Sequence, residues 1–238
     1  MKNKAKKSVL VVGGGSGLGK QLAIAFTDNG WNVTMVSRSH EQFTNSSLPC
    51  YPMPRNEEEV SKAVNHLTDD WTLVVLVSGG GFGKNKLFEE LETLNDISWI
   101  NFGLHYCFMK EFYKAKIKTT VVMFGSIAAR ENIASPSYTL AKKQLETFIR
   151  LFGRKIVESG IVILGISLGA TFCDGNAMDR LKRNNEDAFD EFLTKRLPRK
   201  KFLSSSDIYN FLEYLANSDA SAWAGSVLSM DGGESTHL

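Results

Sequence analysis

Three residue types that together can perform acid–base chemistry on a carbonyl group lie near the middle of the chain. Ser126 ends the apolar run at 121–125, and Tyr138 and Lys142 follow after a segment rich in turn formers. Their spacing places the tyrosine and the lysine on one face of a helix. A lysine ammonium favours the ionised phenol, and a serine hydroxyl can donate a hydrogen bond to a carbonyl oxygen. The pattern predicts a site that moves a proton to or from a substrate oxygen.

A second tyrosine–lysine pair with the same spacing, Tyr106 and Lys110, occurs earlier in the chain. No serine-ended apolar strand precedes it, so we interpret it as two neighbours on a helix face. The spacing is therefore a weak signal by itself, and the elements around the pair decide its meaning.

Composition limits the class of protein. The chain has 238 residues and 43% are hydrophobic, which suits a folded domain with a substantial core. The net charge of +2 gives no reason to expect nucleic acid or an anionic membrane as a partner. The three cysteines are widely spaced and indicate free thiols in a reducing compartment. The four histidines are scattered, so no metal site is predicted.

The N-terminal segment 1–7 is basic, and the apolar run at 9–12 that follows it is short. Such a run is too short for a signal peptide or a membrane span. We therefore expect a cytoplasmic protein that does not bind a membrane.

A glycine-rich turn between a predicted strand and a predicted helix has the pattern of a nucleotide-binding site. Residues 8–12 and 33–36 predict buried strands, and residues 20–29 predict a helix that ends at Gly30. The turn has the spacing G-x-x-x-G-x-G, which brings free backbone amides at a helix N-terminus close to a pyrophosphate. A flexible surface loop is the alternative, and the flanking strand and helix argue against it. The predicted cofactor contacts are Gly13, Gly15, Ser16, Gly17, Leu18 and Gly19.

The end of the second strand predicts which dinucleotide binds. An acidic residue near this point binds the ribose 2′-hydroxyl of NAD, whereas an arginine accommodates the 2′-phosphate of NADP. Ser37, Arg38 and Ser39 stand here, and no acidic residue occurs before Glu41. The three residues are predicted cofactor contacts and favour NADP(H). A solvated arginine at a strand end is the alternative.

The order of the motifs from Ser8 to Gly233 resembles that of the short-chain dehydrogenase/reductase family. The family pattern is a glycine-rich first turn, an asparagine in a helix, a strand-end serine, Tyr-x-x-x-Lys and a final Asp-Gly-Gly. This chain supplies these features at Gly13, Asn101, Ser126, Tyr138, Lys142 and Asp231.

The resemblance implies a catalytic role for four residues. Tyr138 would exchange a proton with the substrate oxygen while NADP(H) exchanges the hydride. Lys142 would lower the pKa of the tyrosine and bond the nicotinamide ribose. Ser126 would polarise the substrate oxygen, and Asn101 would hold a water that relays protons to Lys142. A solvent-exposed or water-bonded side chain is the alternative for Asn101.

Several positions depart from the family. Val12 replaces a threonine, Leu168 replaces a proline, and the loop 78–83 is rich in glycine where the family has Asn-Asn-Ala-Gly. The loss of the asparagines should remove hydrogen bonds that steady the central sheet, and the loss of proline should loosen its turn. The loop can still pass close under the cofactor. The remaining predicted cofactor contacts are Ser78, Gly79, Gly80, Gly169 and Thr171, together with Tyr138 and Lys142.

Only about ten residues separate the second strand from the apolar stretch 47–53, which is fewer than in the family, and this stretch has no Asp in the place of the usual acidic adenine contact. The connecting segment should form a turn instead of a helix, which implies a rebuilt adenine pocket. Helices are predicted over 57–67 and 87–116, and strands over 73–77 and 161–167.

Alternating strands and helices predict an α/β fold, a Rossmann-type doubly wound parallel sheet in three α/β/α layers and one domain over 1–238. The charged segment at about 173–205 occupies the place of the family's substrate lid, although solvated helices would look the same. Its basic run at 196–201 suggests an anionic substrate. The helix at 143–158 has an apolar side that could be core alone, and the resemblance implies a subunit interface in a homodimer or homotetramer.

The sequence therefore predicts an NADP(H)-dependent oxidoreductase that interconverts a carbonyl and an alcohol. Two alternatives stay open: a non-catalytic NAD(P)-binding sensor or structural relative, and an NAD(H)-preferring dehydrogenase. The departures at Val12, 78–83 and Leu168 support the first alternative. The complete set of asparagine, serine, tyrosine and lysine argues against it, since a sensor needs no proton relay.

Overall fold

Seven parallel strands form one sheet in the order β3-β2-β1-β4-β5-β6-β7. The structure is a computed structural model and describes residues 7–67, 70–80, 87–131 and 133–236. The basic segment 1–6 and the loop residues 81–83, on which two predictions fall, lie outside the described residues. The strands are β1 Ser8–Val12, β2 Asn32–Ser37, β3 Cys50–Pro52, β4 Leu73–Leu76, β5 Thr119–Ser126, β6 Ile161–Leu168 and β7 Val227–Met230.

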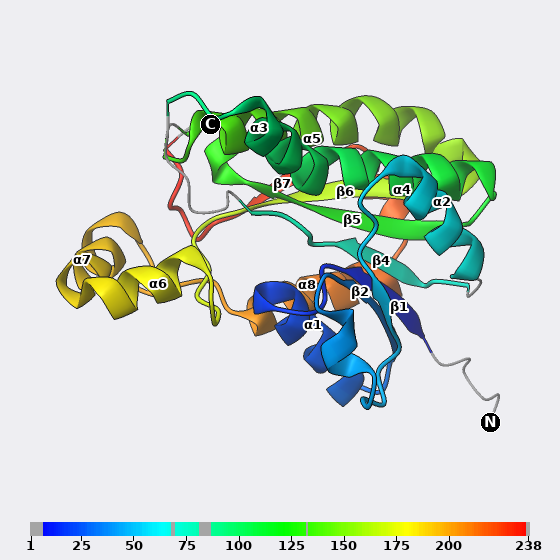
Figure 1. Ribbon diagram of the computed structural model, residues 1–238, viewed down its shortest axis with the longest axis horizontal. Coiled ribbons are helices and arrows are strands. Elements are labelled where there is room, and N and C mark those ends of the chain that lie inside the picture. The colour runs from blue at the N-terminus through cyan, green and yellow to red at the C-terminus, as the bar shows by residue number, and fades with distance from the viewer. Residues whose placement is uncertain (1–6, 68–69, 81–86, 132, 237–238) are drawn as a thin grey trace.

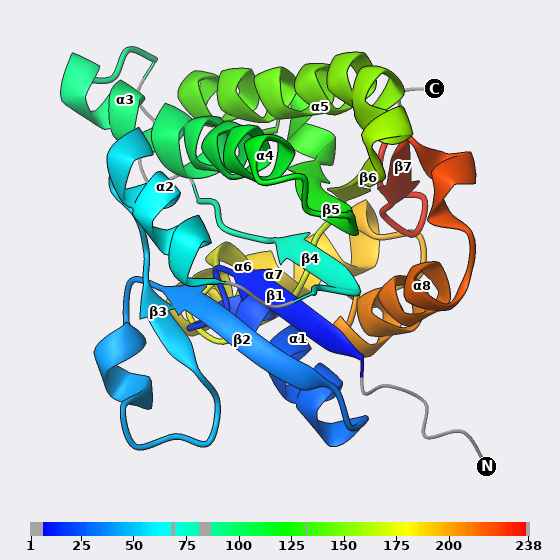
Figure 2. The same ribbon diagram turned by 90° about the vertical axis from the view of Figure 1, so that its right-hand side faces the viewer.

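Helices cover both faces of this sheet (Figures 1 and 2). They are α1 Gly17–Asp28, α2 Glu57–His66, α3 Leu91–Ser98, α4 Leu104–Lys114, α5 Pro136–Ile156, α6 Ala177–Asn184, α7 Glu186–Glu191 and α8 Ser205–Asn217. Short 3-10 turns lie at η1 His40–Phe43, η3 Ile127–Ala129, η4 Val157–Ser159 and η6 Ala220–Trp223, and π-helical turns at η2 Trp99–Gly103 and η5 Phe192–Arg196. The predicted doubly wound α/β fold in one domain is confirmed.

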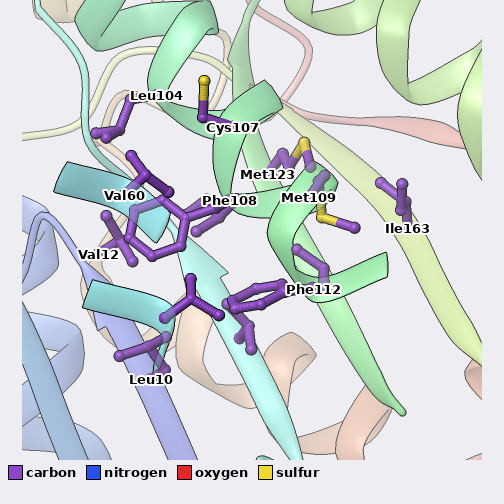
Figure 3. Close-up of a cluster of buried hydrophobic side chains, with 14 of the residues drawn as sticks. Leu10, Val12, Val60, Leu104, Cys107, Phe108, Met109, Phe112, Met123 and Ile163 are labelled. Carbon is purple, nitrogen blue, oxygen red and sulfur yellow. The ribbon is translucent and has the colours of Figure 1, made fainter. Parts of the chain in front are cut away.

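Two apolar cores lie on opposite faces of the sheet because successive residues of a strand point to opposite sides. Leu10 and Val12 of β1 join the core under α2, α4 and α5, of which Figure 3 shows the part around Phe108. Val9 and Val11 join the core under α1 and α8. Both cores hold the strand ends in place, and the predicted functional residues follow those ends.

One predicted feature is confirmed and one predicted helix differs in detail. The crossover from β2 to β3 contains only the turn η1, as the short segment indicated, and β3 is a three-residue edge strand. The single helix expected over 87–116 begins instead at Leu91 and is interrupted by the π-helical turn η2 before α4. The interruption surrounds Asn101, whose side chain bonds the backbone of Ile97 and Gly80.

The segment after β6 forms a projection from the sheet, with α6 and α7 extending away from the body (Figure 1). Four aromatic rings give it an apolar centre of its own: Phe172, Phe189, Phe192 and Phe202. An isolated bridge between Thr171 and Leu203 closes its base. Among the described residues, no helix has the length and apolar character that a membrane span requires.

Candidate active site

The structure brings Ser126, Tyr138 and Lys142 together at the C-terminal end of the sheet. Ser126 is the last residue of β5, and its hydroxyl accepts a hydrogen bond from the Ala128 amide at 3.2 Å. Tyr138 and Lys142 lie in the first two turns of α5, which begins at Pro136 because proline suits the first helical position. The serine is hydrogen-bonded to the Tyr138 phenol, and the lysine ammonium lies 5.7 Å from the centre of the tyrosine ring.

Lys142 is a charged side chain in the core, with only 3% of its surface exposed. Its ammonium donates a hydrogen bond to the Phe124 carbonyl of β5 at 2.8 Å. Burial lowers the pKa of Lys142 to about 8, and the charge of Glu146 opposes this lowering. Glu146 follows one helical turn later and is also buried. Glu146 Oε1 has no hydrogen-bond partner among the described residues, so the glutamate acts on Lys142 through its charge and not through a direct ion pair.

Tyr138 differs from the expectation in one respect. Burial raises the pKa of its phenol above the ordinary value, and the hydrogen bond with Ser126 acts in the opposite direction. The sequence-based expectation was a pKa lowered by Lys142. That expectation is wrong for this structure, because desolvation outweighs the other influences on the phenol and the ammonium is directed to the Phe124 carbonyl.

Asn101 is fully buried, and the backbone satisfies its amide. Its Oδ1 accepts from the Gly80 amide at 3.1 Å, and its Nδ2 donates to the carbonyls of Gly80 at 2.8 Å and Ile97 at 2.9 Å. The alternative of an exposed side chain is therefore wrong. A Cβ built on Gly79 would lie 2.8 Å from Asn101 Oδ1 and 3.1 Å from Lys142 Nζ. The two polar atoms therefore crowd Gly79, and a side chain at this position would collide with them.

The glycine-rich turn packs closely against neighbouring strand ends. Gly13 adopts a φ of 101°, and a Cβ there would lie 2.7 Å from the Ser78 amide nitrogen. A Cβ on Gly19 would lie 2.1 Å from the Gly13 carbonyl oxygen. Ser16 is the N-cap of α1 but makes no side-chain cap, so no side chain occupies the first-turn amides. Gly17 and Leu18 open this turn.

These features fit a dinucleotide, because the turn exposes uncapped amides at a helix N-terminus, where a phosphate binds. The close approaches at positions 13 and 19 explain why glycine is needed there. A Cβ on Gly15 would lie 1.8 Å from Ser37 Oγ, so the turn also rests on the end of β2.

The end of β2 leads into a cleft of about 590 Å³. Ser37 Oγ accepts from the Ser39 amide at 3.1 Å, which orders the backbone on both sides of Arg38. Arg38 lines the cleft, and so does Arg55 from the segment after β3. The other lining residues are His40, Pro52, Met53, Pro54, Glu59, Asp96, Trp99 and Ile100. The cleft lies beside the shortened segment after β2, and the rebuilt adenine pocket stays a prediction for this region.

The loop after β6 carries Gly169 and Thr171. The Ala170 amide between them donates to the Glu234 carboxylate at 2.6 Å, and Gly169 N donates to Met230 O at 3.0 Å. A Cβ on Gly169 would lie 2.7 Å from the Asp231 Cβ, so the C-terminal segment packs against the loop. These contacts hold the turn after β6 in place, where Leu168 stands instead of the family's proline.

The basic run of the projecting segment is bonded within the protein. Arg196 Nε donates to Glu234 Oε1 at 3.4 Å, and Arg199 pairs with Asp207 at 3.8 Å. Lys200 Nζ donates to the Thr194 carbonyl. The expectation of an anionic substrate depended on this run, and these internal partners remove much of its support.

Sequence reasoning missed three buried polar residues around the site. Glu146 faces Gly125 of β5 from α5, His105 bonds Ser78 from α4, and Glu234 bonds Ala170 from the C-terminal segment. Two of them could have been found, because His105 follows Asn101 by four residues and Glu146 follows Lys142 by four. Residues at that spacing share a helix face. Nothing in the sequence pattern pointed to Glu234. Among the described residues, no cluster of His, Cys, Asp or Glu could hold a metal ion.

Comparisons with known proteins agree with this arrangement. A family model described as enoyl-(acyl carrier protein) reductase matches residues 13–235. The 3-oxoacyl-[acyl-carrier-protein] reductase FabG of Staphylococcus epidermidis is 22% identical, over 95% of this chain and 98% of its own. The structure of ElxO with NADP bound has a TM-score of 0.82 at 23% identity and covers 96% of this chain and 98% of that one. The structure of 4-hydroxyisoleucine dehydrogenase with NADH has a TM-score of 0.83 at 15% identity, covering 98% and 100%. At these identities the solved structures show the fold alone.

The buried lysine predicts how stability depends on pH. A lysine with a folded-state pKa of about 8 and an ordinary pKa of 10.5 destabilises the fold while it is charged. The unfolded chain binds more protons between these two values, so this cost fades as the pH rises through that window. The wild type should therefore gain about 1–3 kcal/mol in the free energy of unfolding between pH 7 and pH 10 from this lysine, and Lys142→Met should lack that gain.

Urea unfolding of both proteins at the two pH values measures this difference. Lys155→Met, at an exposed position of the same helix, is the control and should change little. An Lys142→Met variant that shows the same gain as the wild type between pH 7 and pH 10 would contradict the assignment of this gain to Lys142.

Proposed function

The chain belongs to the short-chain dehydrogenase/reductase family, and on this basis we propose that it interconverts a carbonyl and an alcohol by hydride transfer with NADP(H). The observation that carries the proposal is the convergence of Ser126, Tyr138 and the buried Lys142 at the carboxyl ends of the strands. In open α/β sheets ligands bind at this edge.

The proton chemistry follows from the three side chains. A bound nicotinamide would supply or accept the hydride. Tyr138 would donate its proton to the substrate oxygen during reduction and remove it during oxidation. Ser126 would donate a hydrogen bond to the same oxygen and stabilise the charge that develops there. Because burial raises the pKa of Tyr138, the phenol is protonated at neutral pH and ready to act as the acid.

Lys142 and Asn101 would connect this acid to solvent. The lysine pKa of about 8 lies near neutral pH, where a group exchanges protons readily. Asn101 Oδ1 and Lys142 Nζ both lie close to Gly79, and we propose that a water bonded to the asparagine relays protons to the lysine. Glu146 would keep a compensating charge beside the lysine.

The cofactor residues favour NADP(H). Arg38 is the charged residue between Ser37 and Ser39, and it lines the cleft at the end of β2. A 2′-phosphate would lie against its guanidinium, which binds phosphate well. Glu59 lines the same cleft and would repel this phosphate, whereas the guanidinium of Arg55, which also lines it, would attract it. NAD(H) is the alternative that the affinities below distinguish.

An aromatic face on α4 and α5 supports assembly into a homodimer or homotetramer. Leu140 is 61% exposed and Leu151 57% exposed, and both line a shallow pocket of about 360 Å³. Four aromatic rings pack together beside them: Phe102, Tyr106, Phe148 and Phe152. Contiguous exposed apolar surface of this kind marks an interaction site. We propose that it meets a second copy, and that the segment 173–205 acts as the substrate lid.

Replacing the acid tests the catalytic proposal. Tyr138→Phe should reduce turnover of a reducible ketone by about 10²–10⁴-fold and leave NADPH affinity within a few-fold, because only the proton donor is lost. NADPH absorbance follows turnover, and fluorescence titration follows binding. Tyr106→Phe, in the other pair with this spacing, is the matched control and should keep full activity. Activity retained in Tyr138→Phe would contradict the mechanism, and a wild type that binds NADPH but turns over no carbonyl would indicate a sensor.

Removing the guanidinium tests cofactor choice. Arg38→Ala should weaken NADPH binding by about 10–100-fold and leave NADH binding unchanged, because only NADPH carries the 2′-phosphate. Titration of both cofactors against wild type, Arg38→Ala and the exposed control Lys155→Ala measures this. Equal loss for the two cofactors, or no loss for NADPH, would defeat the assignment.

Placing a charge on the aromatic face tests assembly. Phe152→Glu should shift the wild-type oligomer towards a monomer in sedimentation experiments, because an unpaired buried charge is costly. Tyr214→Glu, at an exposed position of α8, is the control and should leave the mass unchanged. A monomeric wild type, or an unchanged mass in Phe152→Glu, would exclude this face as the interface.

A further inference from the structure

The loop Ser78–Gly80 is held by two side chains that lie one helical turn apart. Asn101 bonds both the amide and the carbonyl of Gly80, at 3.1 and 2.8 Å. His105 of α4 bonds Ser78 through its Nε2, at 2.8 Å from the serine Oγ. The hydrogen bonds of Asn101 are made to the backbone. The hydrogen bond of His105 joins two side chains, and neither of them transfers a proton in the proposed mechanism.

The Ser78–His105 bond is a neutral one in the protein interior. Ser78 is 5% exposed and His105 fully buried. Burial, together with the charge of Lys142, lowers the pKa of His105 to about 3. The ring is therefore uncharged at physiological pH and cannot act as a proton carrier there. Its Nδ1 has no hydrogen-bond partner among the described residues, so Ser78 is the polar group that orients the ring.

Ser78 lies between two parts of the site. Its amide donates to the Val12 carbonyl at 3.0 Å, and a Cβ on Gly13 would lie 2.7 Å from the same nitrogen. The next residue, Gly79, borders the Lys142 ammonium. A shift of Ser78 would therefore move the pyrophosphate turn on one side and the surroundings of the lysine on the other.

We propose that the Ser78–His105 hydrogen bond positions the loop beneath the cofactor, which makes His105 a positioning residue for dinucleotide binding. The pair replaces the hydrogen bonds that the asparagines of the family pattern make from this loop. The inference rests on the proposed function, since it requires that NADP(H) binds at the glycine-rich turn.

Binding experiments on the full chain test the pair without requiring turnover. Ser78→Ala and His105→Leu should each weaken NADPH binding about tenfold, measured by fluorescence titration. The double variant should bind NADPH about as well as the single variant with the lower affinity, because each residue acts through the other. The pH profile of turnover at saturating NADPH should keep its wild-type shape, since neither side chain transfers a proton.

Two further variants keep the test decisive if His105→Leu fails to fold. Ser78→Asn inserts the family's residue and should retain NADPH affinity within about threefold, whereas Ser78→Ala should not. His66→Leu replaces an exposed histidine of α2 and is the control.

Three results would overturn the inference. They are unchanged NADPH affinity in Ser78→Ala, additive losses in the double variant, and a shifted pH profile with unchanged affinity, which would place His105 in proton transfer. If the wild type itself binds no dinucleotide, the proposed function fails instead, so the two failures are distinguishable.

Discussion

The burial of one ammonium group is the constraint on which the site depends. Lys142 is almost completely removed from solvent, and an unpaired charge there would be costly. The Phe124 carbonyl supplies a hydrogen bond and Glu146 supplies a compensating charge. Both come from the strand and helix that also carry Ser126 and Tyr138, so the elements that hold the charge also position these two side chains. The convergence of Ser126, Tyr138 and Lys142 is thus a consequence of how β5 and α5 pack.

The loops around this lysine lack several of the family's residues but are bonded in other ways. The loop after β4 has lost its asparagines, and side chains from η2 and α4 hold it instead. The loop after β6 has lost its proline, and Glu234 of the C-terminal segment holds it. In each case a buried polar side chain from another element satisfies the loop backbone or a loop side chain. The departures at 78–83 and Leu168 favoured a non-catalytic relative. The contacts that these departures remove are therefore replaced by other contacts in this chain.

The fold was predictable from sequence because each strand is a short apolar run and each crossover carries a helical period or a turn signal. Ser126, Tyr138 and Lys142 were predictable because a strand end and one helical turn fix where they lie. What could not be predicted depends on contacts distant in the chain. The raised pKa of Tyr138 reflects its burial, and the bond between Glu234 and Ala170 joins residues 64 positions apart. The π-helical turn at Asn101 likewise depends on a loop twenty-one residues earlier.

The central claim is that these groups converge on a nicotinamide ring, and a crystal structure of the protein with NADP⁺ tests it most directly. The account predicts the pyrophosphate against the amides of Gly17 and Leu18 and the nicotinamide ribose within hydrogen-bond reach of Lys142, about 2.6–3.2 Å. Tyr138 and Ser126 should both face the ring. A nicotinamide placed away from the lysine, or a dinucleotide bound elsewhere on the chain, would contradict it.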